Sequence, residues 1–268
     1  MAVEWLLPAA KEAYKHREVG FSTWDGFVEN VFGPKTRIAI VGPQGIGKSV
    51  LLDHLTGKAR KKNYQSPGKS SKAEPGRIKA GDNRLAITVA PGAGGPQVDT
   101  FNEVFNADDP VDGVIFVAAS GLVTLREENA VEANISRGYR SIDDWRALNV
   151  GGEIEYLKEV AAKIRSTKAK NRRPRWLLVA ATKTDLYYDD VSEEEKFYSP
   201  HFESNFSNVL HTLRCDVGRD NFEWEAVPVC SQMDDFIWGE QSLTSQLSSE
   251  DRDHYLAQMT RRLGELCR

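Results

Sequence analysis

The chain has 268 residues, of which 40% are hydrophobic and 28% are charged, and its formal net charge is −4. This length suits one large domain or two small ones, and the weak negative charge excludes a protein whose whole surface binds polyanions. No hydrophobic run approaches the ~20 residues of a membrane-spanning helix. The three cysteines and five histidines have neither disulfide-framework nor metal-ligand spacing, so we expect a cytoplasmic protein of a reducing compartment.

Residues 1–35 are predicted to form a helical N-terminal extension. Leu6, Leu7, Ala10 and Tyr14 recur near helical spacing. We favour packing of this extension on the domain that follows. The alternative is an arm that binds a partner or a membrane surface, and the small number of lysines and arginines argues against the membrane.

The phosphate-binding motif G-x-x-x-x-G-K-[ST] occurs at residues 42–49, between an apolar run at 38–41 and an amphipathic segment at 50–55. Glycines let successive backbone N–H groups point at one anion, and the N-terminus of the following helix adds its positive dipole end. We expect Lys48 to reach the β- and γ-phosphates and the Ser49 hydroxyl to ligate Mg²⁺. The predicted nucleotide-binding residues of this P-loop, or Walker A motif, are Gly42, Gly45, Ile46, Gly47, Lys48, Ser49 and Val50.

The helix that follows the phosphate-binding motif should end near Gly57. The residues after it alternate between the composition of loops and that of strands. Polar and basic residues 58–71 have the composition of a loop, and the hydrophobic runs on either side of residues 80–83 predict a β-hairpin. Residues 91–96, Pro-Gly-Ala-Gly-Gly-Pro, predict a flexible loop. Residues 114–119 form an apolar run without polar interruptions, which indicates a strand buried on both faces, as in parallel sheets.

Residues 127–166 predict a long helical region with breaks near Gly138 and at Gly151 and Gly152. A second uninterrupted strand is predicted at residues 176–181. Because strands alternate with helices, we expect an α/β fold with a mainly parallel central sheet, one antiparallel edge hairpin and helices on both faces. Ligands in such sheets bind at the carboxyl ends of the strands, where the phosphate-binding motif lies.

Thr182-Lys183-Thr184-Asp185 follows this strand directly and fits [NT]-K-x-D, the guanine-reading motif of regulatory GTPases. An aspartate accepts two hydrogen bonds, from N1–H and the 2-amino group of guanine. Adenine lacks this pair of donors, and a buried acceptor left unpaired costs ~1–3 kcal/mol. The aliphatic stem of Lys183 can lie flat over the base. We therefore predict that Thr182, Lys183 and Asp185 form the base-binding site.

The last part of the chain predicts an insertion over residues 186–221, with a helix around residues 201–213. A strand is predicted at residues 224–229. A closing helix should begin near Ser248 or Ser249, because Ser248 and Asp251 approximate a capping box.

With these motifs, residues 36–268, apart from the insertion at residues 186–221, resemble the small Ras- and Arf-like P-loop GTPase domain of the translation-factor-related class. The resemblance implies that the loop Val229-Cys230-Ser231-Gln232 contacts the guanine oxygen, with Ser231 and Gln232 as the base-binding residues. A serine after a strand is otherwise an ordinary turn or cap. The resemblance also implies GTP or GDP and Mg²⁺ as ligands.

The chain departs from this family at the motif D-x-x-G, where residues 89–92 read Val-Ala-Pro-Gly. The aspartate that holds Mg²⁺ through water in the family is replaced by Val89, so metal binding would depend on Ser49 alone. Gly92 can still sense the γ-phosphate through its N–H group. Ala93 stands where a water-orienting glutamine is common. The nearby residues that could replace this glutamine are Gln97, Asp99 and Glu103.

Two further switch features are incomplete. The loop at residues 58–71 offers Ser66, Ser70 and Ser71 but no threonine to match the metal-binding switch threonine of the family. Gln44, inside the phosphate-binding motif, could obstruct a partner's arginine finger, approach the γ-phosphate, or point to solvent.

We expect a GTP-binding molecular switch, a hydrolase with slow or partner-dependent, magnesium-assisted GTP hydrolysis. Its candidate catalytic residues are Lys48, Gln44 and Gly92. One alternative is a catalytically degenerate scaffold module that binds GTP or GDP as a structural ligand. A less suitable alternative is a P-loop ATPase or kinase, because Asp112 begins a strand rather than ending one. The expected partners are a guanine nucleotide and a protein effector or regulator. Nucleic acid is not expected, and membrane contact is disfavoured but stays open.

Overall fold

A six-stranded sheet with the strand order β2-β3-β1-β4-β5-β6 forms the centre of the molecule. The computed structural model describes residues 36–68, 73–80, 83–90, 104–105, 111–125, 127–167, 173–187 and 196–267. The predicted extension at residues 1–35 and the predicted loop at residues 91–96 lie outside the described residues. Within the described part, no helix combines the length and hydrophobicity needed to cross a bilayer.

Five of the six strands run parallel, and the edge strand β2 is antiparallel to β3. The strands are β1 (Arg37–Val41), β2 (Glu74–Ala80), β3 (Asn83–Val89), β4 (Gly113–Ala118), β5 (Trp176–Ala181) and β6 (Glu223–Pro228). The predicted mainly parallel α/β sheet with one antiparallel edge hairpin is therefore confirmed. Since all five parallel strands end at the same edge, the segments that follow them meet there.

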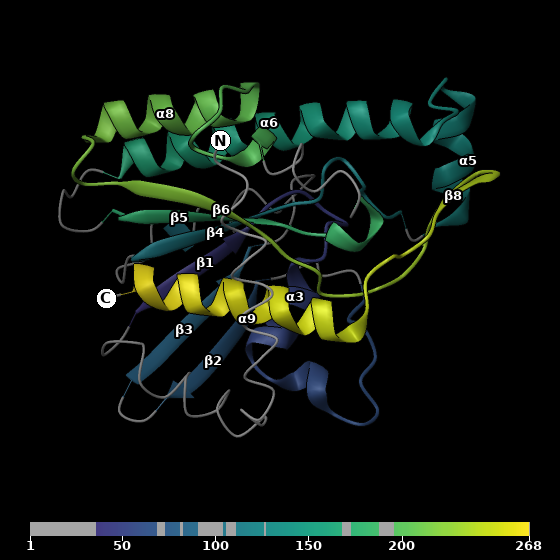
Figure 1. Ribbon diagram of the computed structural model, residues 1–268. Coiled ribbons are helices and arrows are strands. Elements are labelled where there is room, and N and C mark those ends of the chain that lie inside the picture. Colours follow the sequence, from purple (N-terminus) through teal and green to yellow (C-terminus); the bar gives the residue numbers. More distant parts are fainter. Residues whose placement is uncertain are drawn as a thin grey trace, which may run out of the picture.

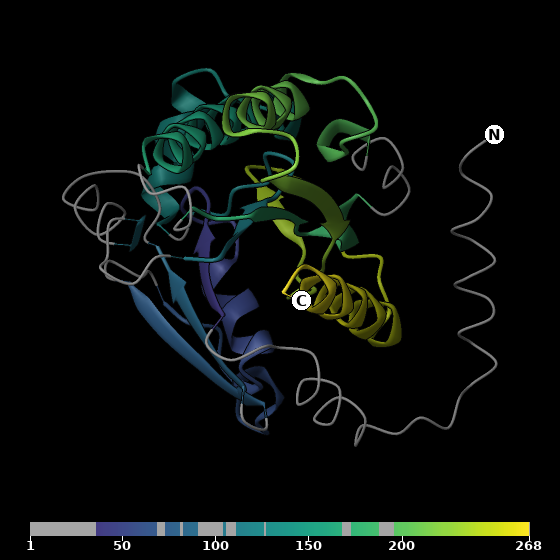
Figure 2. The same cartoon turned by 90° about the vertical axis from the view of Figure 1, so that its left-hand side faces the viewer.

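Helices cover both faces of this sheet, as predicted (Figures 1 and 2). On one face lie α3 (Lys48–Leu55) and α9 (Ser249–Leu266), and on the other lie α6 (Ile142–Ser166) and α8 (Asn205–Val217). Residues of each strand alternate between the two cores: Ile38 and Ile40 pack with α3 and α9, whereas Ala39 packs with α6 and α8. This two-residue period explains why the central strands are apolar throughout.

The long helical region of the sequence consists of α5 (Glu128–Ser136) and α6. The predicted break near Gly138 is confirmed. The predicted break at Gly151 and Gly152 is wrong, because α6 continues through both glycines. A glycine inside a helix costs about 1 kcal/mol relative to alanine. The capping box of Ser141 and the buried inner face of the helix outweigh this cost.

The predicted start of the closing helix is confirmed, since the Ser248 hydroxyl accepts a 3.1 Å hydrogen bond from the N–H of Asp251 at the N-terminus of α9. Lys58–Arg60 and Thr184–Leu186 form two short 3-10 helices.

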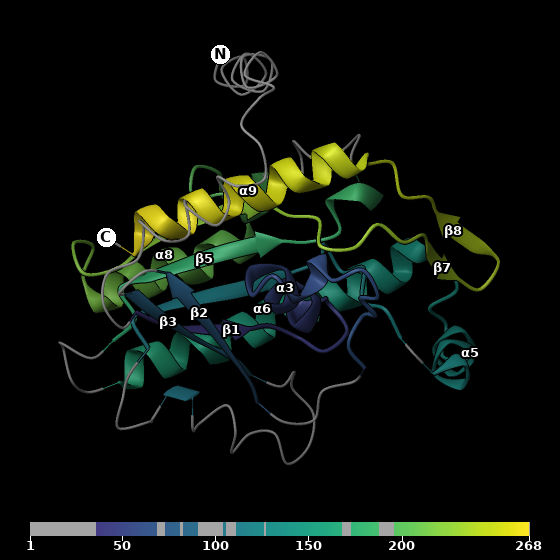
Figure 3. The same cartoon turned by 90° about the horizontal axis from the view of Figure 1, so that it is seen from below.

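The sequence did not predict the hairpin of β7 (Phe236–Trp238) and β8 (Gln241–Leu243), which lies beside α5 at one end of the molecule (Figure 3). Trp238 stacks on Trp145 of α6, with ring centroids 4.2 Å apart and planes 16° apart. Its indole N–H also donates a 2.8 Å hydrogen bond to the carbonyl of Tyr139. The hairpin is thereby fixed against α6 and brings Phe236 to the carboxyl edge of the main sheet.

Candidate functional site

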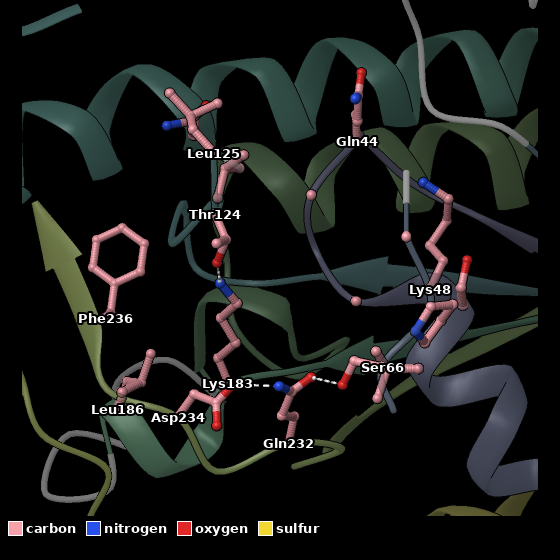
Figure 4. A pocket seen from close by; sticks show the side chains of 18 of the residues that line it. Gln44, Lys48, Ser66, Thr124, Leu125, Lys183, Leu186, Gln232, Asp234 and Phe236 are labelled. Carbon is pink, nitrogen blue, oxygen red and sulfur yellow. Dashed lines mark hydrogen bonds between the residues drawn. The ribbon is translucent and has the colours of Figure 1, made fainter. Parts of the chain in front are cut away.

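A cavity of about 700 Å³ lies at the carboxyl edge of the sheet, between the loop after β1 and the loop after β5 (Figure 4). Most of the residues predicted from the sequence as nucleotide-binding line this cavity. Those that line it are Gly45, Gly47, Lys48, Ser49, Val50, Lys183, Asp185 and Gln232, and the catalytic candidate Gln44 lines it as well. The others are buried behind its wall: Gly42, Ile46, Thr182 and Ser231.

The loop after β1 can follow its path only with glycine at two positions. Gly42 and Gly45 have φ angles of 144° and 79°, which L-residues rarely adopt. A Cβ atom on Gly42 would lie 2.5 Å from the Val117 carbonyl oxygen, and one on Gly45 would lie 2.6 Å from that of Thr124. The loop is thus pressed against the end of β4. Gly47 at the N-cap of α3 brings no side chain to its first N–H groups, which leaves them to a ligand.

Lys48 is buried at the start of α3 and folds back over the loop. Its Nζ donates hydrogen bonds to the carbonyl oxygens of Gly42, at 2.7 Å, and Pro43, at 2.6 Å. Burial lowers the pKa of Lys48 to about 7, and the negative charge of Glu74 opposes this change. Both acceptors are neutral carbonyl groups, so an anionic phosphate would be a stronger partner for the ammonium group.

Thr182 ties the end of β5 to the loop after β1. Its hydroxyl donates to the carbonyl oxygen of Ile46 at 3.1 Å and to that of Ala118 at 2.8 Å. Two residues on, the Thr184 hydroxyl bonds the Val229 carbonyl oxygen at 3.0 Å. These hydroxyl groups fix the relative positions of the loops that surround the cavity.

Asp185 is a buried carboxylate in the cavity wall, with a side chain that is only partly satisfied. It is 1% exposed, and its Oδ1 accepts a weak hydrogen bond from the Cys230 thiol at 3.4 Å. Its Oδ2 is buried without a hydrogen-bond partner among the described residues. Burial raises the pKa of Asp185, which the nearby Ser245 hydroxyl and Cys230 thiol oppose. A ligand with two adjacent N–H donors would satisfy this carboxylate.

Lys183 extends along the same wall (Figure 4). Its backbone is left-handed, with φ at 62°, and its Nζ donates to the Thr124 hydroxyl at 2.6 Å and to the Leu122 carbonyl. The ammonium group lies 5.2 Å from the centroid of the Phe236 ring. Burial lowers the pKa of Lys183 to about 8. The side chain is held at both ends, so its aliphatic stem presents a fixed apolar strip to the cavity.

A hydrogen-bonded bridge crosses the mouth of the cavity. The Ser66 hydroxyl donates to Gln232 Oε1 at 2.9 Å, and Gln232 Nε2 donates to Asp234 (Figure 4). Residues 66–68 of the predicted switch loop thus lie against the loop after β6, which the sequence predicted as base-binding. Ser70 and Ser71, the other serines considered there, lie outside the described residues.

Sequence reasoning missed Glu153, which holds the segment after β4. This carboxylate is fully buried in α6, and its Oε1 accepts hydrogen bonds from the N–H groups of Ala119, at 3.0 Å, and Gly121, at 3.1 Å. Its Oε2 accepts a 2.8 Å hydrogen bond from the Tyr198 hydroxyl. A glutamate on the apolar face of a predicted helix was the available signal. The segment that Glu153 holds continues to residues 123–125, which line the cavity.

The described residues around Ser49 supply only some of the oxygen ligands that a divalent cation needs. Val89, 2% exposed, lines the cavity at the end of β3 and offers no oxygen ligand. Gln44 is exposed at the rim. The predicted catalytic Gly92, like Ala93, lies outside the described residues. So do the three residues considered as replacements for the missing glutamine: Gln97, Asp99 and Glu103.

Comparison with known proteins gives one match to a family. The family model described as 50S ribosome-binding GTPase matches residues 37–179, a range that includes the phosphate-binding motif and ends three residues before Thr182. No curated protein matches the chain.

Two solved structures are among those similar to this chain. The FeoB G-domain from Methanococcus jannaschii is 14% identical, with a TM-score of 0.39 over 88% of this chain and 99% of that one. The structure of the chloroplast translocon components atToc33 and psToc159 is 13% identical, with a TM-score of 0.42 over 87% of this chain and 82% of that one.

Proposed function

This chain belongs to the family described as 50S ribosome-binding GTPase, and from that premise we propose that its cavity binds GTP and GDP and that the bound nucleotide switches the protein between two states. GTP binding and hydrolysis are general properties of this family. The proposal assigns roles to individual residues and adds magnesium, the switch and a protein partner.

The unpartnered carboxylate oxygen of Asp185 carries the proposal. It is buried in the cavity wall, where an acceptor without a donor costs ~1–3 kcal/mol. Guanine presents N1–H and the 2-amino group side by side and would satisfy both carboxylate oxygens, whereas adenine would leave the buried oxygen unpaired. The fixed stem of Lys183 would cover one face of the base. Ser231 and Gln232 would contribute from the loop after β6.

The glycine loop and Lys48 would hold the phosphates. The first N–H groups of α3 and the loop amides would donate to the phosphate oxygens. Lys48 would exchange its two carbonyl partners for the β- and γ-phosphates. The Ser49 hydroxyl would ligate Mg²⁺, which neutralises the charge that develops on these phosphates during hydrolysis. Lys48, Gln44 and Gly92 are the proposed catalytic residues.

The switch would operate through the loop at residues 58–71 and the residues that follow β3. Ser66 bonds Gln232 across the cavity mouth in this structure, so a nucleotide that enters must share or displace this contact. Loops that contact the γ-phosphate are released when it is lost, and a protein effector or regulator would read the difference. With Ala93 at the usual glutamine position, we expect slow intrinsic hydrolysis or hydrolysis that depends on a partner.

One observation favours a second function. Val89 lines the cavity with an apolar side chain, at the position where a carboxylate would help to hold Mg²⁺. A domain that binds GTP or GDP as a structural ligand, without turnover, would tolerate this residue. The nucleotide would then stabilise the fold by mass action alone.

Competition between GTP and ATP for the purified protein tests the base assignment, and a hydrolysis assay with and without Mg²⁺ separates the two functions. We expect GTP and GDP to bind and ATP to compete weakly, with slow GTP turnover in Mg²⁺. Tighter binding of ATP would overturn the proposal. Binding of GTP without turnover, also in cell extract that supplies partners, would favour the structural ligand.

A further inference from the structure

The sheet register places a glutamate directly beside Val89. Strands β2 and β3 are antiparallel, and Glu74, the first residue of β2, pairs with Val89, the last residue of β3. Directly opposed residues of an antiparallel pair project to the same face of a sheet. The Glu74 side chain therefore leaves the sheet on the face from which Val89 lines the nucleotide cavity.

The neighbouring residue Gly76 shows which helix this face meets. A Cβ atom on Gly76 would lie 2.6 Å from Leu52 Cδ1 and 3.2 Å from Thr56 Cγ2, so this face of β2 packs on α3. Residues 74 and 76 share a face, since side chains alternate along a strand. The side chain of Glu74 is consequently directed to the same side of the sheet as α3.

The position of Glu74 along the axis of α3 follows from the rise per residue of a strand and of a helix. From Gly76 to Glu74 the strand advances by roughly 6.6 Å toward the carboxyl edge of the parallel sheet. One turn of helix back from Leu52, roughly 5.4 Å, reaches Lys48 and Ser49. Glu74 therefore lies level with the residues that we propose bind the phosphates and the metal.

A second hollow links Glu74 to these residues. Glu74 lines this hollow of about 540 Å³, together with Asp53 of α3, and Pro67 lines both this hollow and the nucleotide cavity. The two hollows thus adjoin at Pro67.

We propose that Glu74 supplies the carboxylate for the metal at this site, in place of a residue at the end of β3. Mg²⁺ is usually held by one or two carboxylates together with phosphate oxygens and water, and a glutamate one strand away can accept a hydrogen bond from a metal-bound water. Ser49 would remain the direct protein ligand. The inference rests on the proposed binding of GTP with Mg²⁺.

Equilibrium binding of a fluorescent GDP and a fluorescent GTP, each measured in Mg²⁺ and in excess EDTA, tests this role. We expect Mg²⁺ to tighten binding to the unmodified chain, and Glu74→Gln to reduce this tightening roughly tenfold to a hundredfold. The affinity of the Glu74→Gln variant for nucleotide in EDTA should be unchanged or higher, because the substitution removes a negative charge near the phosphates. Direct Mn²⁺ titration by electron paramagnetic resonance should show the same loss.

Glu223→Gln is the matched control, since Glu223 also begins an edge strand but lies at the opposite end of the parallel sheet. It should leave the Mg²⁺ effect unchanged. A second variant, Glu74→Gln with Val89→Asp, should restore the Mg²⁺ effect if it still binds nucleotide in EDTA.

Three outcomes would overturn the inference. Glu74→Gln could keep the full Mg²⁺ effect, Mg²⁺ could fail to tighten binding to the unmodified chain, or the double variant could bind nucleotide in EDTA without recovering the effect. In each case guanine nucleotide still binds, so the proposed binding of GTP and GDP stands. Absence of guanine nucleotide binding in EDTA and in Mg²⁺ alike would instead remove the proposed function itself.

Discussion

Thr182 and Ile46, which are 136 residues apart, are joined by a hydrogen bond of 3.1 Å from the threonine hydroxyl to the isoleucine carbonyl. This bond connects the loop that we propose binds the base to the loop that we propose binds the phosphates. The same hydroxyl bonds the Ala118 carbonyl at the end of β4. One side chain thus joins the loop after β5 to the loop after β1 and to the end of β4.

Thr182→Val should therefore weaken both stability and nucleotide binding. Valine has nearly the same shape but leaves two buried carbonyl oxygens with fewer donors, so we expect a loss of about 1–3 kcal/mol in the free energy of unfolding. Chemical denaturation measures this loss, and calorimetry should show weaker GDP binding. Thr212→Val is the control, because the Thr212 hydroxyl bonds Asn208 on the exposed surface of α8. Equal effects of the two substitutions would contradict the assigned role.

Gly42→Ala should destabilise the fold, whereas Gly151→Ala should stabilise it. The first substitution places a Cβ atom 2.5 Å from the Val117 carbonyl oxygen at a φ of 144°, and we expect a cost of about 1–3 kcal/mol. The second fills open space in the middle of α6 and should gain about 1 kcal/mol. Thermal unfolding of the two variants compares them directly. A neutral Gly42→Ala variant would show that the loop after β1 does not need its observed path.

Glu153 and Tyr198 should be energetically coupled. Glu153→Gln replaces an acceptor with an amide group that cannot satisfy both the N–H donors of the loop after β4 and the Tyr198 hydroxyl. A double-mutant cycle with Tyr198→Phe should give a coupling of about 0.5–3 kcal/mol in the free energy of unfolding. Glu155→Gln, two residues along the same helix and exposed, should show none. Additive effects of the first two substitutions would contradict the buried network.

Nucleotide-free protein should become more stable when Asp185 is replaced by asparagine. Burial raises the pKa of Asp185 in the folded protein, so the folded state retains a proton over a pH range in which the unfolded state has released it. The stability contributed by this group therefore falls as pH rises through the raised pKa. Asp185→Asn removes that cost, and its melting temperature should exceed that of the unmodified chain at about pH 7 and approach it in acid. A constant difference across this pH range would refute the explanation.

Much of the fold could be predicted because each element has a local signal. The alternation of two cores along β1 appears as an apolar run, and the phosphate-binding motif marks the loop that follows. The β7–β8 hairpin could not be predicted, since its three-residue strands depend on the stacking of Trp238 on Trp145, 93 residues away. The continuity of α6 through Gly151 likewise depends on tertiary packing that outweighs helix propensity.

The candidate site likewise contains residues that local motifs predict and residues that they do not. Lys48, Ser49 and Asp185 belong to short motifs with fixed spacing, and the structure brings them to one cavity. Glu153 holds its loop through hydrogen bonds to residues distant in the sequence, and its local signal is only a charged residue on the apolar face of a helix. The role that we propose for Glu74 depends on strand register, which no local pattern encodes. The position of Glu74 beside Val89 is visible only once β2 and β3 are paired.

The most direct test of the central claim is the nucleotide preference of Asp185→Asn. Asparagine offers an N–H donor where aspartate only accepts, and xanthine carries a carbonyl group at the position of the guanine 2-amino group. Calorimetric titration should show that the unmodified chain prefers GTP to xanthosine triphosphate and that the variant reverses this preference. An unchanged preference for GTP in a correctly folded variant would contradict the assignment of Asp185 as the residue that reads the base.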